Sequence, residues 1–276
     1  MSAPTRTDPG LPERLRGATV READLSGTTL QECTLTGVRL IGCDWEGALA
    51  ISAFAGRLGT VVVEGVDVTA YVEAELDRRH PERVALRELS TADDFRAAWE
   101  AIDALWRDTL ADAEQLPEEV RQGRVGDEWS LVQTLRHLVH AVDVWVGRMI
   151  EGVPDFHPLG LPPTDGTAAS PTDTGTDTGT DTGTGTGTDT GPADLGPDLP
   201  VSFDEAAAAH AVARERVRKT LADLTDEGLA RVCTAVPAPG RREESRPVAG
   251  CLRVVLDEHV EHRRYALRDL ALLRAG

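Results

Sequence analysis

The sequence predicts a mostly α-helical protein in which an antiparallel four-helix bundle follows a short repetitive segment. Three observations support this prediction. Four stretches of about 20 residues place apolar side chains at helical spacing, each long enough for a helix of roughly 30 Å. A strict period of five residues near the N-terminus fits neither a helix nor a strand. A tract rich in Thr, Gly and Asp divides the helical part of the chain.

The N-terminal part begins with residues 1–12, which are rich in Pro and Thr and are expected to be disordered. A repetitive β segment is predicted for residues 13–64. Apolar residues recur in it every fifth position, at Leu15, Val20, Leu25, Leu30, Leu35, Leu40 and Trp45. A fixed repeat of this kind indicates a solenoid, in which each repeat packs on its neighbours.

The unit Ala-Asp-Leu-Ser-Gly at 23–27 and its neighbours resemble the pentapeptide repeats over residues 15–45. The resemblance implies a right-handed, four-sided β-helix whose central leucines face inward. The segment is little more than one coil, so we expect it to pack on the part of the chain that follows. Residues 58–69 are predicted to form β structure with a Gly-containing turn, and residues 69–79 a short helix that ends before His80 and Pro81.

The helical domain is predicted for residues 65–276. Its first long helix begins at Thr91, with acidic residues in the first turn, and ends before Pro117. The second begins at Ser130 and extends to Met149, the third runs from Ser202 to Leu224, and the fourth from Val248 to Leu273. Four amphipathic helices of similar length favour an antiparallel bundle. Residues 164–200, between the second and third helices, are predicted to be a disordered insertion.

Composition excludes several classes of function. The formal net charge of -18 argues against nucleic acid and against anionic membrane surfaces as partners, and no apolar run is long enough to span a membrane. No signal peptide is evident, and the four cysteines form no CxxC pair, so we expect a cytoplasmic protein with free thiols. The sequence contains no GxSxG, P-loop, HExxH or GxGxxG motif.

The fourth predicted helix carries a cluster of ionisable residues, Glu258, His259 and His262. Glu258 and His262 are four residues apart, so they share a helix face with Cβ atoms about 5–6 Å apart. That spacing suits one metal ion with mixed imidazole and carboxylate ligands. A helical wheel places His259 and His262 on the apolar side and Glu258 at its edge. It places the following residues on an opposite, solvated face: Asp257, Glu261, Arg264 and Arg268.

Further histidines lie elsewhere in the helical part. His137 and His140 lie beside the apolar stripe of the second helix, and only one of them is needed as a third ligand. His80, His157 and His210 are expected on the surface or in loops. Trp129 and Trp145 are expected in the core. From burial alone, His259 with His262 is the favoured pair on the fourth helix, and at this point that choice remains open.

Three motifs together resemble the DinB-like superfamily over residues 90–275: Trp129-Ser130 opening a helix, Leu135-x-His137-Leu138, and Glu258-xxx-His262. The resemblance implies a four-helix bundle whose metal is held by one His from the second helix and by a Glu or His with a later His from the fourth. It assigns His137, Glu258 and His262 as ligands, with His259 and His140 as alternate candidates. Tyr265 and Asp269 continue the same side of the helix as expected partners of the ligands.

Members of this superfamily include mycothiol-dependent maleylpyruvate isomerases and thiol S-transferases. The resemblance implies that a divalent metal deprotonates a small thiol such as mycothiol, which then attacks an electrophilic substrate. Zn²⁺ suits the ligand types best, and Ni²⁺ or Fe²⁺ are alternatives. Two other interpretations stay open: a non-catalytic metal-binding or interaction protein, and a metal-dependent hydrolase that activates water. The residues do not decide between a monomer and a homodimer.

Overall fold

The computed structural model describes residues 60–126, 128–163, 196 and 199–275, together with single positions and short runs between 15 and 43. The chain divides into two compact units, Met1–Ile51 and Ser52–Gly276. The predictions of disorder for residues 1–12 and 164–200 fall outside the described residues, apart from Gly196, Leu199 and Pro200. The predicted β-helix as a whole also lies outside them.

In the first unit, the same tight turn is present at three described places that lie ten residues apart. The backbone N–H groups of Ala18, Thr28 and Val38 donate to carbonyl groups three residues earlier, at 3.0–3.1 Å. Gly17 and Gly37 occupy the third position of their turns with φ of 70° and 74°, a conformation that glycine adopts without steric cost. The repeat positions predicted to face inward are exposed where they are described, namely Leu15, Val20, Leu25, Leu35 and Leu40.

The described part of the second unit begins with a β-hairpin of β1 (Val62–Val63) and β2 (Val66–Asp67). The two residues between the strands, Glu64 and Gly65, both have positive φ, as a type I′ turn requires. The short helices α2 (Thr69–Arg79) and α3 (Glu82–Arg87) follow. Arg83 of α3 pairs with two carboxylates of α2 and so ties these helices together. The predicted turn and the predicted short helix are therefore both present.

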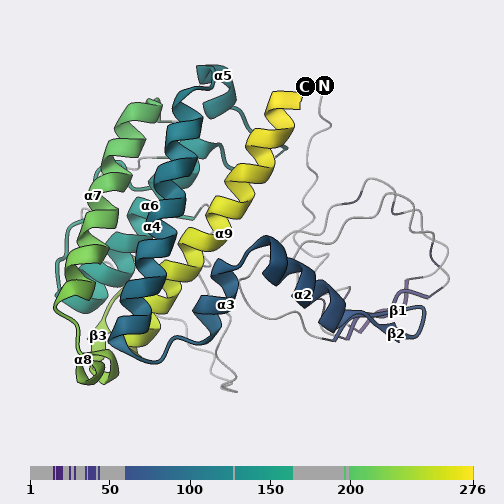
Figure 1. The fold of residues 1–276 in the computed structure, drawn as a ribbon, viewed down its shortest axis with the longest axis horizontal. Coiled ribbons are helices and arrows are strands. Elements are labelled where there is room, and N and C mark those ends of the chain that lie inside the picture. The colour runs from purple at the N-terminus through teal and green to yellow at the C-terminus, as the bar shows by residue number, and fades with distance from the viewer. Residues whose placement is uncertain are drawn as a thin grey trace. The chain divides into compact units, whose positions relative to one another are not determined.

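Four long helical elements form the body of the second unit (Figure 1). They are α4 (Ala92–Glu114), α6 (Leu131–Val142), α7 (Phe203–Ala222) and α9 (Val248–Ala275). Both α4 and α6 contact α7 and α9. The connections hold the short helices α5 (Glu118–Arg121) and α8 (Asp226–Ala230) and an antiparallel strand pair, β3 (Val232–Ala235) with β4 (Glu244–Pro247). The mostly helical fold predicted from the sequence is confirmed.

Three of these helices begin with a reciprocal capping box. Thr91, Ser130 and Ser202 each accept a hydrogen bond from the backbone N–H three residues later, and the side chain at that later position bonds back to the cap. Each box satisfies two backbone donors that would otherwise lack a partner at a helix N-terminus. The helix starts predicted from these residues are confirmed.

The second long helix changes from an α-helix to a π-helix partway along its length. The α-helical part ends at Val142, and the chain continues as a π-helix, Asp143–Glu151, which ends at Gly152 in the left-handed conformation. Arg216 of α7 pairs with Asp143 and Glu151 at the two ends of this segment. A Cβ at Gly147 would lie 2.9 Å from the Arg216 guanidinium, so a glycine there gives the guanidinium room against the helix.

The core lies among the four long helices. Trp99, Ile102 and Trp106 of α4 are almost fully buried against apolar residues of the other three, including Leu135, Leu138, Val217, Leu252 and Leu256. The apolar face predicted for α4 is therefore the core face. Within the described residues, no helix combines the length and the apolar character needed to cross a membrane.

Candidate metal centre

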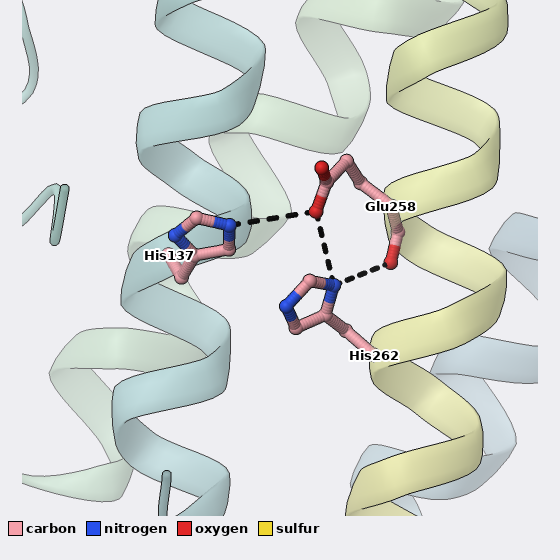
Figure 2. A group of neighbouring side chains, drawn as sticks. All are labelled: His137, Glu258 and His262. Carbon is pink, nitrogen blue, oxygen red and sulfur yellow. Dashed lines mark hydrogen bonds and ion pairs between the residues drawn. The ribbon is translucent and has the colours of Figure 1, made fainter. Parts of the chain in front are cut away.

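Three ionisable side chains converge between α6 and α9. His137 comes from α6, and Glu258 and His262 come from successive turns of α9 (Figure 2). One ligand atom from each lies within 4.8 Å of the other two, and this is the one such group of three in the described part of the chain. Glu258 and His262 share a face because they are one helical turn apart. His137 lies next to them because α6 contacts α9.

The Glu258 carboxylate lies between the two imidazoles. Its Oε2 atom is 3.4 Å from Nε2 of His137 and 3.1 Å from Nδ1 of His262. His137 is 8% exposed, while Glu258 and His262 are partly buried. Oε2 is buried and accepts no hydrogen bond, although it is within ion-pair distance of both rings. A buried carboxylate oxygen in this position is an incompletely satisfied polar atom.

Backbone carbonyl groups determine which ring nitrogens carry hydrogen. Nδ1 of His137 lies 3.1 Å from the Leu161 carbonyl oxygen, and Nδ1 of His262 lies 2.9 Å from the Glu258 carbonyl oxygen. A carbonyl oxygen only accepts, so each Nδ1 donates and each neutral ring keeps its lone pair on Nε2. Nε2 of His137 therefore presents a lone pair to the Glu258 carboxylate, and a cation between these two acceptors would satisfy both.

The pKa values of the three residues are shifted in different directions. Burial lowers the pKa of His137 more than the nearby Glu258 carboxylate raises it, so the ring is neutral. Burial also acts to lower the pKa of His262, but the nearby Glu258 carboxylate and the hydrogen bond to the Glu258 backbone carbonyl outweigh burial, and the pKa is raised. Burial acts to raise the pKa of Glu258, but the two imidazoles hold it well below its usual range. The donor set of two imidazoles and one carboxylate fits a divalent transition-metal ion.

Aromatic side chains enclose the group. The Trp129 ring lies 4.5 Å from the His137 ring and is nearly parallel to the His262 ring at 5.9 Å, measured between centroids. Tyr265 meets His262 edge-on at 6.2 Å. The sequence predicted Trp129 in the core, but this residue is only half-buried and packs against both imidazoles. Tyr265 contacts a candidate ligand as expected, while Asp269 pairs with Arg268.

The two alternate candidates lie outside the converging group. His259 is fully buried, donates from Nδ1 to the Val255 carbonyl at 2.7 Å, and packs edge-on against Trp99. His140 stacks on Phe156 at 5.2 Å. Burial lowers the pKa of each of these histidines to about 4. The pair favoured by burial, His259 with His262, is therefore not the pair that the structure brings together with His137.

Two further placements predicted from the sequence, those of His210 and Glu261, are wrong. His210 was expected on the surface, but it lies on the core face of α7 and is fully buried. The buried residues Ala206, Ala213 and Val217 lie at helical spacing around His210. This spacing indicates a core face, but the pattern is weak because the helix is rich in alanine. Glu261 was expected on a solvated face but is 5% exposed and pairs with Arg264. The helix α3 contacts α9, and its Arg83 lies close enough to Glu261 to act on the pKa of that carboxyl group. The helical wheel assumed four packed helices, so it did not include a contact between α9 and a further helix such as α3.

Comparisons with known proteins cover both units. The sequence model of the DinB superfamily matches residues 101–266, which is more than half of the chain and includes all three converging residues. Pentapeptide repeats match residues 14–48 in eight copies. Neither a curated protein nor a solved structure matches the chain.

Proposed function

This chain belongs to the DinB superfamily and carries N-terminal pentapeptide repeats, and we propose that it uses His137, Glu258 and His262 to bind a divalent metal ion. Its four contacting long elements would form the antiparallel bundle of that superfamily. The observation that supports this proposal best is the buried Glu258 Oε2, which accepts no hydrogen bond and faces the Nε2 lone pair of His137. A cation resolves this contact between two acceptors.

The donor set favours Zn²⁺, which binds imidazole nitrogen and carboxylate oxygen readily, while Ni²⁺ and Fe²⁺ accept the same ligands. Three protein ligands leave at least one coordination position for an exchangeable molecule. The protein's part is to hold the two Nε2 atoms and the carboxylate in place. Trp129, packed on both imidazoles, limits the movement of the rings and the access of water.

We propose that the exchangeable molecule is a low-molecular-weight thiol such as mycothiol, and that the reaction transfers it to a small electrophile. A bound metal ion of this kind holds a thiol as the thiolate, which is the nucleophilic form. Of the three described cysteines, Cys43 is exposed and belongs to the first unit, while Cys233 and Cys251 of the second unit are buried, and burial raises the pKa of Cys251 to about 12. Burial makes the two thiols of the unit that holds the candidate metal centre unsuited to nucleophilic attack, so the proposal assigns that role to a cosubstrate.

Metal analysis of the purified protein tests the centre. We expect one divalent ion per chain, its loss in His262→Ala, and its retention in His140→Ala, a histidine of α6 that lies outside the group. Stoichiometric metal that persists in His262→Ala would contradict the ligand assignment.

Thiol titration of the metal-loaded protein then tests the transferase part. A thiol that coordinates as thiolate releases a proton, which calorimetry in buffers of different ionisation enthalpy measures. Metal-loaded protein that binds no thiol and releases no proton would instead favour the hydrolase or the non-catalytic alternative.

A further inference from the structure

We infer that Arg136 is a positioning residue of the metal centre. It holds the segment 159–161 against α6, so that the Leu161 carbonyl keeps hydrogen on Nδ1 of His137 and leaves Nε2 free to bind metal. The inference rests on the metal site proposed above, and it concerns how this chain prepares one ligand before any metal arrives.

The Arg136 side chain is 1% exposed, which is unusual for a charged group. Its Nε donates to the Leu159 carbonyl at 3.0 Å and its Nη2 donates to the Gly196 carbonyl at 3.3 Å. A buried guanidinium requires acceptors of this kind, and here they are backbone atoms before the segment 164–200 and near the end of it. Arg136 therefore connects two stretches that are far apart in sequence to the helix that carries His137.

Leu161 completes the connection. Its N–H donates to the Arg136 carbonyl at 3.0 Å, and its own carbonyl accepts from Nδ1 of His137 at 3.1 Å. Its side chain is buried in the domain. The backbone and the side chain of Arg136 therefore both hold the segment. The segment in turn contacts the imidazole of His137, the residue that follows Arg136. A shift of this segment would move the carbonyl that selects the tautomer of His137.

Gly160 allows the segment to approach α6 closely. A Cβ at this position would lie 3.1 Å from the His157 carbonyl oxygen and 3.4 Å from Cβ of His140. The first of these contacts is with backbone, which yields little. A glycine at this position therefore permits the two hydrogen bonds between the segment and Arg136, one to the Leu159 carbonyl and one from the Leu161 N–H.

The tautomer matters because the alternative competes with metal. If the hydrogen were on Nε2 of His137, it would point toward Glu258 Oε2, 3.4 Å away, and a hydrogen bond between two candidate ligands would form. Metal binding would then require that bond to break and the ring to change tautomer. The Leu161 carbonyl prevents this state as long as Arg136 holds its segment in place.

The test measures the tautomer and the metal affinity separately. In metal-free protein at a pH where the ring is neutral, ¹⁵N NMR of His137 reports which nitrogen carries hydrogen, and Co²⁺ titration followed by absorption reports affinity. We expect the wild type to carry hydrogen on Nδ1. In Arg136→Met, a population with hydrogen on Nε2 should appear and the Co²⁺ affinity should fall about 10- to 100-fold, the usual effect of losing a partner of a ligand.

Arg148→Met is the matched control, because Arg148 also donates to two backbone carbonyls, those of Val236 and Pro154, but none of them contacts a candidate ligand. It should leave the tautomer and the affinity unchanged. Gly160→Ala provides a second route if Arg136→Met does not fold, since it displaces the segment while Arg136 remains. It should produce the same Nε2 population.

The outcomes separate the inference from the metal site. Wild-type protein that binds no Co²⁺ overturns the metal site itself. Wild-type protein that binds Co²⁺, with Arg136→Met and Gly160→Ala unchanged in both tautomer and affinity, overturns only the role of Arg136.

Discussion

Two pairs of histidines lie close together in this protein, and their surroundings differ. His137 and His262 share the Glu258 carboxylate, and each donates from Nδ1 to a backbone carbonyl. His210 and His259 stack at 5.4 Å in the core, with Trp106 edge-on to both. Both nitrogens of His210 and Nε2 of His259 have no hydrogen-bond partner there. Burial of an imidazole alone therefore does not mark a ligand; the nearby carboxylate does.

The largest effect should follow from removing that carboxylate charge. Glu258→Gln keeps the shape of the side chain but leaves a neutral amide between the two imidazoles. We expect Zn²⁺ affinity to fall by more than the roughly 100-fold that loss of an outer partner causes, measured by competition with a chelating dye. Asp257→Asn is the matched control when both variants are compared at about pH 8.5, because burial raises the pKa of Asp257 to about 7 and this adjacent acid of α9, outside the converging group, is ionised only above that value. Equal losses in the two variants would show that general charge, not ligation, holds the metal.

The buried histidines of the core, His210 and His259, should make the free energy of unfolding depend on pH. Burial, with the neighbouring His259, holds the pKa of His210 well below its usual value of 6.5. As pH falls below 6.5, the unfolded chain binds a proton at this position and the folded chain does not, so stability is present above pH 6.5 and declines below it. The contribution of His210 is about 1.4 kcal/mol for each pH unit in that window.

Urea unfolding of metal-free protein at several pH values between 7.5 and 5 measures this slope. His210→Leu should remove part of it, so that the wild type loses more stability than the variant as the solution becomes acidic. Parallel curves for the two proteins would mean that His210 does not stay neutral in the fold, and the contrast between the pairs would disappear.

These comparisons indicate what the sequence could and could not supply. Capping residues such as Thr91 and Ser202 predicted the helix starts because their effect is local. The spacing of Glu258 and His262 predicted a shared face for the same reason. The burial of Glu261 depends on α3, and the contact of Leu161 with His137 depends on the path of a loop 24 residues away along the chain. Such contacts arise from tertiary packing, which local patterns do not encode.

The smallest effect should separate helix stability from site geometry. Ser130 and Ser202 cap α6 and α7 in the same way, each within a capping box. Replacing either with alanine should lower the free energy of unfolding by about 1 kcal/mol, measured by chemical denaturation. Only the Ser130 cap lies at the start of the helix that carries His137, next to Trp129, which packs on both imidazoles. We therefore expect a measurable fall in Zn²⁺ affinity for Ser130→Ala and none for Ser202→Ala. If the two variants lost affinity equally, the centre would depend on the stability of the whole domain instead of on the local order of α6.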